Sequence, residues 1–125
     1  MGNRVVVIPS ESAPLAALEF YQILETSDVP AGVVNIITGN KNELAETLAD
    51  HYEVEAMWYW GDETGSKMVE NAASANLKRT WVNYGKTRDW FDNDQAQGQE
   101  FLNQATDVKN IWTPYGEINA GNNKY

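Results

Sequence analysis

Val5-Val6-Val7-Ile8, a continuous run of β-branched residues, predicts a short β-strand that is buried on both faces. Pro9 closes the run, because proline has no N–H to donate to a continuing ladder. A strand without polar alternation is typical of parallel sheets, whose two faces are both covered by helices. The run therefore indicates an α/β protein if helices and similar strands follow it.

Helical and strand patterns do alternate along the chain as far as Gly85. A first helix is expected after Pro14, with either Ser10 or Ser12 available to cap it. Asp62 is the expected N-cap of a later helix. The expected segments are a helix over 13–25, a strand over 33–37, a helix from Asn40 or Asn42 to Tyr52, a strand over 56–60, a helix over 62–76 and a strand over 79–84.

Strands that alternate with helices are joined by right-handed crossovers and lie parallel to one another. We therefore expect an α/β fold with one parallel sheet of about four strands and helices on both faces. The length of 125 residues suits a single domain over 1–125. Beyond the fourth strand we expect a C-terminal helical extension over 87–116, with one helix at about 95–107, and a frayed tail over 117–125.

Composition and charge narrow the class of protein. Eighteen acidic and nine basic side chains give a formal charge of -9, which disfavours nucleic acid as a partner. No apolar run approaches the ~20 residues of a membrane span, and Met1-Gly2-Asn3-Arg4 leads into the first strand without a signal-peptide pattern, so we expect a cytoplasmic protein without membrane contacts. There is no cysteine and a single histidine, His51, so no metal site is expected.

Four motifs, in order, resemble segments of the aldehyde dehydrogenase superfamily. Residues 2–11 are similar to the family's GNTVVLKPSE, and residues 29–39 to its PPGVVNIVTG. Residues 58–65 stand where the family has FTGSTEVG, and residues 76–86 follow its NLKR and LELGGK. The match over 2–86 implies the NAD-binding portion of that family, a Rossmann-like three-layer domain. The wording of the last motif looks most like the degenerate second module of family-16-type members.

The resemblance also implies where a nucleotide ribose and pyrophosphate would lie. In the family a Lys and a Glu after the first strand hold the ribose; here the Lys position is Ile8, while Pro9 and Glu11 remain. The family's phosphate turn opens with a Gly, and that position is Trp60, whose indole we expect to fill the phosphate space. The vestigial cofactor-binding residues are therefore Pro9, Glu11, Gly39, Gly61 and Gly65.

The catalytic residues of the family are not matched. The general-base Glu of LELGGK aligns with Val82, which cannot accept a proton, and no cysteine is present as nucleophile. Trp58 and Trp60 alternate on one strand and share a sheet face that Trp81 can meet, so these three indoles are either core or candidates for a protein interface.

The leading hypothesis is a non-catalytic aldehyde dehydrogenase-like domain that acts as a structural or oligomerisation module, or is a fragment of a larger protein. One alternative is part of an NAD(P)-dependent aldehyde dehydrogenase, an oxidoreductase acting on aldehydes. A second is a nucleotide-binding regulatory module. The expected partner is protein, either a second copy or the remainder of a larger aldehyde dehydrogenase-like protein. No cofactor is expected, or NAD(P) if the pocket is retained.

Overall fold

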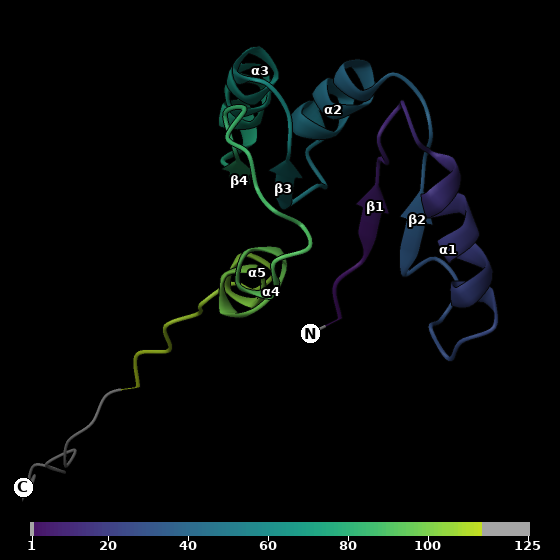
Figure 1. Ribbon diagram of the computed structural model, residues 1–125. Helices are drawn as coiled ribbons and strands as arrows, with labels where there is room; N and C mark the ends of the chain where they lie inside the picture. The colour runs from purple at the N-terminus through teal and green to yellow at the C-terminus, as the bar shows by residue number, and fades with distance from the viewer. Residues whose placement is uncertain (1, 114–125) are drawn as a thin grey trace, which may run out of the picture.

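The computed structural model describes residues 2–113 as alternating strands and helices (Figure 1). The alternation confirms the α/β class predicted from the sequence. The expected tail over 117–125 lies outside the described residues, as does the end of the extension expected over 87–116. The elements in chain order are β1 (Val5–Val7), α1 (Leu15–Glu25), β2 (Val34–Ile36), α2 (Lys41–Asp50), β3 (Ala56–Tyr59), α3 (Glu63–Ala73), the 3₁₀ turn η1 (Ser74–Asn76), β4 (Arg79–Val82), α4 (Asn93–Ala96) and α5 (Gln99–Gln104).

The four strands form two parallel pairs, and the expectation of one four-stranded sheet needs correction. β1 pairs with β2, and β3 pairs with β4 with Ala56 opposite Arg79. The strands are arranged in the order β4, β3, β1, β2, and no described ladder joins β1 to β3 (Figure 1). β1 has three residues. If β1 also paired with β3, it would gain only a few backbone hydrogen bonds, each contributing about 1 kcal/mol. Pairing between β1 and β3 is therefore only weakly favoured.

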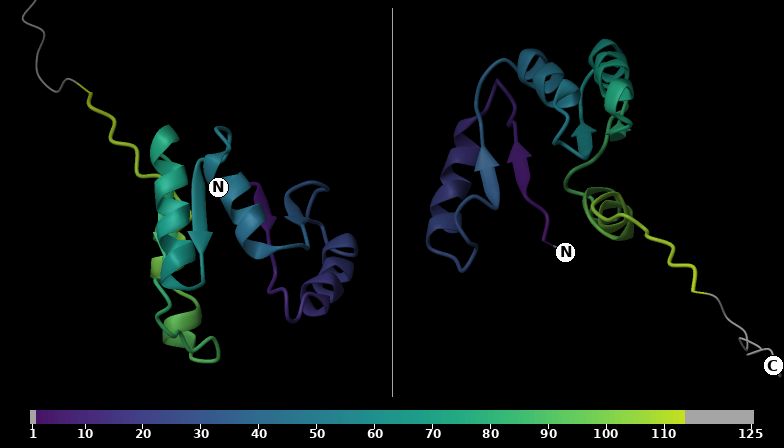
Figure 2. Two further views of the ribbon diagram at one scale, coloured as in Figure 1. Left: turned by 90° about the horizontal axis from the view of Figure 1, so that it is seen from above. Right: turned by 180° about the vertical axis from the view of Figure 1, so that it is seen from behind.

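The expectation that the first strand is buried on both faces is wrong. Val5, Val6 and Val7 are 43%, 42% and 36% exposed. The helix that follows, α1, packs against β2 at the outer side of the pair, away from β3 and β4 (Figure 2). The apolar run predicted the strand and its parallel pairing correctly, but the described residues leave much of its surface uncovered.

The core of the described residues lies between β3 and the helices α2 and α3. Met57 and Tyr59 point from β3 toward Val69 of α3 and the two alanines of α2, Ala45 and Ala49, and all five side chains are buried. On the opposite face of the β3–β4 pair, Phe101 of α5 contacts Trp58 and Trp81. Helices therefore cover both faces of this pair, as expected.

The structure confirms two of the helix N-caps predicted from the sequence and corrects the third. Asp62 caps α3, since its Oδ1 accepts from the Gly65 N–H at 2.8 Å, and Asn40 caps α2. Neither Ser10 nor Ser12 caps α1: their hydroxyls hydrogen-bond each other at 2.9 Å, and the helix begins only after Pro14. α2 ends at Asp50, so the expectation that this helix runs to Tyr52 is corrected by two residues.

The helix expected at 95–107 is divided into α4 and α5 by Gly98, whose φ of 106° no helix accommodates. Both helices lie beside the β3–β4 half of the molecule (Figure 1). Within residues 2–113, no helix is both long and apolar enough to cross a membrane.

Candidate functional site

The turn between β3 and α3 is joined to the end of β4 by two hydrogen bonds of Gly61. The Gly61 N–H donates to Asn83 Oδ1 at 2.9 Å, and the Gly85 N–H donates to the Gly61 carbonyl at 2.7 Å. The Asp62 cap closes the first turn of α3 from the other side. The start of α3, where a helix N-terminus presents free N–H groups, is therefore a rigid part of the molecule.

Tyr59 fills the space over this turn. The residue is only 4% exposed, and its hydroxyl donates to Asn42 Oδ1 of α2 at 3.1 Å. A Cβ added at Gly61 would lie 2.5 Å from Tyr59 Cε1, and a Cβ added at Gly65 would lie 2.0 Å from its hydroxyl oxygen. The phenol ring therefore packs directly against the two glycines.

Trp60 does not occupy the place predicted for it. Its indole lies on the opposite sheet face, with its ring centroid 4.8 Å from Trp81 and 5.3 Å from Trp90. Side chains alternate along a strand, so Trp58 and Trp60 point one way and Tyr59 points toward the helices. That period-two pattern was in the sequence, and it identifies Tyr59 as the ring at the start of α3.

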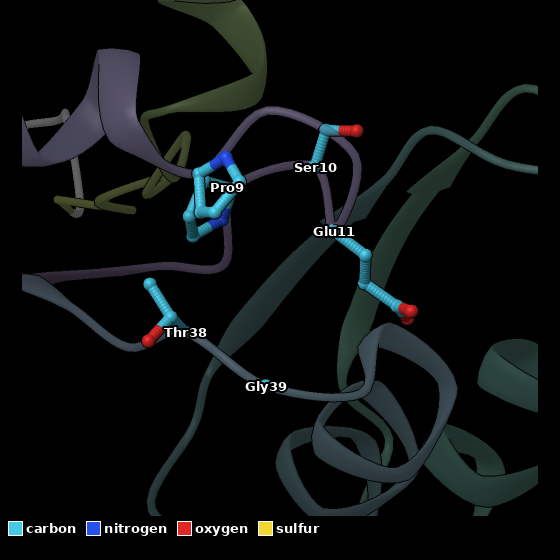
Figure 3. A pocket seen from close by; sticks show the side chains of 6 residues that line it. Pro9, Ser10, Glu11, Thr38 and Gly39 are labelled. Carbon is cyan, nitrogen blue, oxygen red and sulfur yellow. The ribbon is translucent and has the colours of Figure 1, made fainter.

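The vestigial residues Pro9, Glu11 and Gly39 do come together at the carboxyl ends of β1 and β2. With Ser10, Pro14 and Thr38 they line an open concavity of ≈ 250 Å³ (Figure 3). The Glu11 carboxylate extends toward α2, where its Oε1 accepts the Lys41 N–H at 2.5 Å. This side chain therefore acts as a capping group for α2 and links the two strand pairs. Gly61 and Gly65 lie apart from this concavity, under Tyr59.

A second concavity, of ≈ 340 Å³, lies between α2 and the start of α3. Its lining includes three carboxylates, those of Glu43, Glu46 and Asp62. Glu43 stands in the first turn of α2 and Asp62 is the N-cap of α3, where the helix dipole stabilises a negative charge and that charge opposes an incoming anion. Among the described residues, no group of three or more acidic, His or Cys side chains is arranged to hold a metal ion.

The end of β4 carries the position that the resemblance assigns to the general base. Val82 is half-buried and packs against the core. Two residues later, Tyr84 stands at a family glycine position with φ 51°, in the left-handed region. Its hydroxyl donates to the Glu70 carboxylate, and that hydrogen bond, with desolvation and the nearby negative charges, raises the pKa of Tyr84.

The three indoles named as interface candidates form one cluster, which the chain itself partly covers. Trp58 and Trp81 meet edge to face at 5.0 Å. Trp90, Phe101 and the Arg88 guanidinium lie over them. Sequence reasoning missed these three residues, and the signal that could have found Trp90 and Phe101 is the aromatic content of residues 90–101.

Parallel strands joined through helices, with turns gathered where β1 and β2 end, define the class of Rossmann-like α/β domains. The family model of the aldehyde dehydrogenase family matches residues 1–107. The chain therefore belongs to the aldehyde dehydrogenase family, as the four motifs predicted. The finer resemblance to the family-16 second module stays a prediction.

Individual relatives give the same result. The NADP/NAD-dependent aldehyde dehydrogenase PuuC of Escherichia coli (strain K12) is 33% identical over 85 residues, which are 67% of this chain and 17% of that protein. The 1-pyrroline-5-carboxylate dehydrogenase of Bacillus thuringiensis (strain Al Hakam) is 34% identical over 82 residues, 65% of this chain and 16% of that protein.

Solved structures confirm the fold. The aldehyde dehydrogenase AldC of Pseudomonas syringae, solved as a mutant with NAD+ and octanal, matches with a TM-score of 0.61 and 32% identity over 63% of this chain and 16% of that one. KauB of Pseudomonas aeruginosa matches with a TM-score of 0.61 and 32% identity over 65% of this chain and 17% of that one. The chain thus spans about a sixth of the length of the relatives it matches.

Proposed function

We propose that this chain is a non-catalytic module of the aldehyde dehydrogenase family, acting in the cytoplasm, which contributes a folded surface for association with protein. The observation that carries the proposal is the position of Tyr59. A phenol ring packed on Gly61 and Gly65 takes the space in which, by the family resemblance, backbone would approach a pyrophosphate. The residues present do not fit a dinucleotide at this place.

The charges around the turn support the same proposal. Asp62 and Glu63 lie at the start of α3, and Glu43 and Glu46 face it from α2. The Glu63 carboxylate accepts a hydrogen bond from Lys67, and this bond together with the lysine charge lowers the pKa of Glu63. A dianionic pyrophosphate would meet this negative charge without a free cation in the turn.

The chemical groups of the family reaction are replaced in this chain. Val82 stands at the general-base position, and the 125 residues contain no cysteine. This chain therefore supplies neither the proton acceptor nor the thiol that the resemblance implies.

The exposed apolar side chains support association. On α1, Leu15, Phe20 and Ile23 are 71%, 50% and 60% exposed, although a helix of a soluble monomer normally exposes polar residues. We propose that protein covers this helix, either a second copy of the chain or further aldehyde dehydrogenase-like sequence.

Calorimetric titration with NAD, NADP and AMP tests the pocket. We expect the chain to bind each with a Kd above about 1 mM, and a Tyr59→Thr variant, which restores the family residue, to bind AMP about tenfold more tightly. Circular dichroism establishes that both proteins are folded. Micromolar binding by the unaltered chain would contradict the proposal.

One observation favours the nucleotide-binding alternative, whether as a regulatory module or as part of an NAD(P)-dependent enzyme. The concavity lined by Pro9, Glu11 and Gly39 lies where the resemblance places the ribose, and Glu11 retains its carboxylate. If the unaltered chain binds AMP and Glu11→Gln does not, this concavity is a nucleotide site and the alternative replaces our proposal.

A further inference from the structure

We propose that the aromatic cluster on the α5 side of β3 and β4 is a cage for organic cations, occupied in the free chain by Arg88 and able to take an external quaternary ammonium group in its place. The cage is made of Trp58, Trp60, Trp81, Trp90 and Phe101. It lies on the sheet face opposite Tyr59. The proposal therefore holds whether or not the chain binds a nucleotide or associates with protein.

The five rings are joined edge to face. Trp81 is at the centre, with its centroid 5.0 Å from Trp58, 4.8 Å from Trp60 and 5.1 Å from Phe101. Trp90 closes the cluster at 5.3 Å from Trp60. Interplanar angles of 58–84° mean that the rings do not stack in parallel. Three of these rings, those of Trp60, Trp81 and Phe101, present themselves to one small volume.

A cation already occupies that volume. The Arg88 guanidinium carbon lies 5.2 Å from the ring centroid of Trp60, 5.3 Å from that of Trp81 and 5.2 Å from that of Phe101. Each distance is within the range of about 6 Å over which the ring quadrupole attracts a cation. Three rings acting on one charge is the geometry by which aromatic cages recognise quaternary ammonium and methylated lysine groups.

Arg88 is an imperfect occupant, because its hydrogen-bonding capacity is poorly met. Nη2 pairs with the Glu100 carboxylate, but Nη1 is buried and has no hydrogen-bond partner among the described residues. Two buried N–H donors without acceptors oppose the cation–π attraction. A quaternary ammonium group has no N–H donor, so it would gain the same attraction from the rings without that penalty. The chemistry of the walls therefore favours a methylated ammonium over a guanidinium.

The occupant can leave without disturbing the core. Arg88 belongs to the irregular segment 86–91, and its side chain is 20% exposed. Trp58 and Trp90 at the rim are 37% and 49% exposed. The net charge of -9 attracts cations to the molecule.

Tetramethylammonium chloride is the probe, titrated against the chain while tryptophan fluorescence and the indole N–H NMR signals are recorded. Arg88→Ala empties the cage, and Arg4→Ala, the same change at an exposed arginine outside it, is the matched control. We expect Arg88→Ala to bind the probe about tenfold more tightly than the unaltered chain or Arg4→Ala. Neopentyl alcohol, a neutral molecule of similar shape, should bind Arg88→Ala about tenfold more weakly than the probe.

Two results overturn the proposal: equal binding of the probe and the alcohol by Arg88→Ala, or equal binding of the probe by all three proteins. If Arg88→Ala loses the circular dichroism spectrum of the folded chain, Glu100→Gln serves instead, because it removes the carboxylate that holds Arg88 and keeps the rings. Glu100→Gln should then bind the probe about threefold more tightly than the unaltered chain. No gain in that variant would likewise overturn the proposal.

Discussion

Tyr59 and Tyr84 show how single residues alter a family site while its fold is kept. Tyr59 turns two glycines that suit a phosphate turn into the packing surface of a ring. Tyr84 occupies a glycine position and keeps the glycine backbone, with φ 51°. Tyr59 fills space beside the two glycines, and Tyr84 adopts a backbone conformation that favours glycine; each gains side-chain contacts in return. The effect of each tyrosine on stability can therefore be measured by a single substitution.

The left-handed backbone of Tyr84 predicts an unusual order of stability for two substitutions. Tyr84→Gly and Tyr84→Ala remove the same hydrogen bond to Glu70 and nearly the same side chain. Because Gly adopts φ 51° without steric cost, we expect Tyr84→Gly to be about 1 kcal/mol more stable than Tyr84→Ala. Urea denaturation measures the difference. At an ordinary helical or extended position Ala is the more stable residue, and that order would show that the strain is absent.

The raised pKa of Tyr84 predicts a loss of stability in alkali. Because the folded pKa lies above the reference value of 10.0, the contribution of Tyr84 is complete below pH 10 and is lost as the pH rises through the folded pKa. Glu70→Gln removes the carboxylate that accepts the hydroxyl proton, so the pKa of Tyr84 should fall toward its ordinary value. Absorbance at the tyrosinate band, titrated with pH, follows the change, and Glu46→Gln is the control. A Tyr84 titration that Glu70→Gln leaves unaltered would contradict the assignment.

At the scale of elements, α3 depends on a glycine for a reason other than backbone freedom. Gly65 lies in the first turn of α3 with helical geometry, and the atom that a Cβ would meet first is the Tyr59 hydroxyl oxygen at 2.0 Å. The helix and the ring therefore fit only as a pair.

A double-mutant cycle tests this fit between Gly65 and Tyr59. Gly65→Ala alone should destabilise the chain by about 1–3 kcal/mol, because the added methyl group displaces the ring. In a Tyr59→Thr background the same change should be neutral or stabilising by about 0.5–1 kcal/mol, the usual gain of Ala over Gly within a helix. Thermal unfolding of the four proteins gives the coupling. Equal effects in both backgrounds would mean that Tyr59 is not over Gly65.

The C-terminal end of α2 depends on a buried ammonium group. Lys78 Nζ donates to the carbonyl oxygens of Leu48 and His51 at 2.8 and 2.7 Å, at the end of α2 where helix carbonyls lack an intrahelical partner. Burial lowers the pKa of Lys78. We expect Lys78→Met to destabilise the chain by about 1–3 kcal/mol in chemical denaturation, since the Leu48 carbonyl loses its donor and the His51 carbonyl keeps only its bonds from Val54 and Asn76. Lys67→Met, at an exposed pair with Glu63, should change stability by less than about 0.5 kcal/mol.

Much of the fold was predictable because it is encoded locally. The apolar runs predicted all four strands, and the Asp62 cap and the helical spacing predicted α3 within a few residues. What local patterns could not give were contacts between distant segments. The docking of Arg88 and Phe101 on the indoles, and the absence of a ladder between β1 and β3, depend on pairings far apart in sequence. The error over Trp60 was of a different kind, because strand periodicity already placed Tyr59 on the helix side.

At the scale of the whole molecule, the described residues bury a core on one half and leave apolar surface on the other. The buried cluster lies around β3, α2 and α3, whereas α1 has no fully buried residue. An 11-residue helix of mostly apolar composition gains little stability in water by itself. We propose that a protein partner covers α1 and stabilises it in the native chain.

This distribution predicts self-association that is sensitive to charge on α1. Light scattering coupled to size exclusion should show a mass that rises with concentration, and added salt should strengthen association because two copies each carry a charge of -9. Ile23→Glu places a carboxylate on the apolar surface and should raise the dissociation constant about tenfold or more. Gln22→Glu adds the same charge at a polar position of the same helix and should raise it by much less. A monomer at every concentration and salt would mean that any cover for α1 comes from a different polypeptide segment. Equal effects of the two variants would show that charge repulsion alone, and not burial of Ile23, governs the contact.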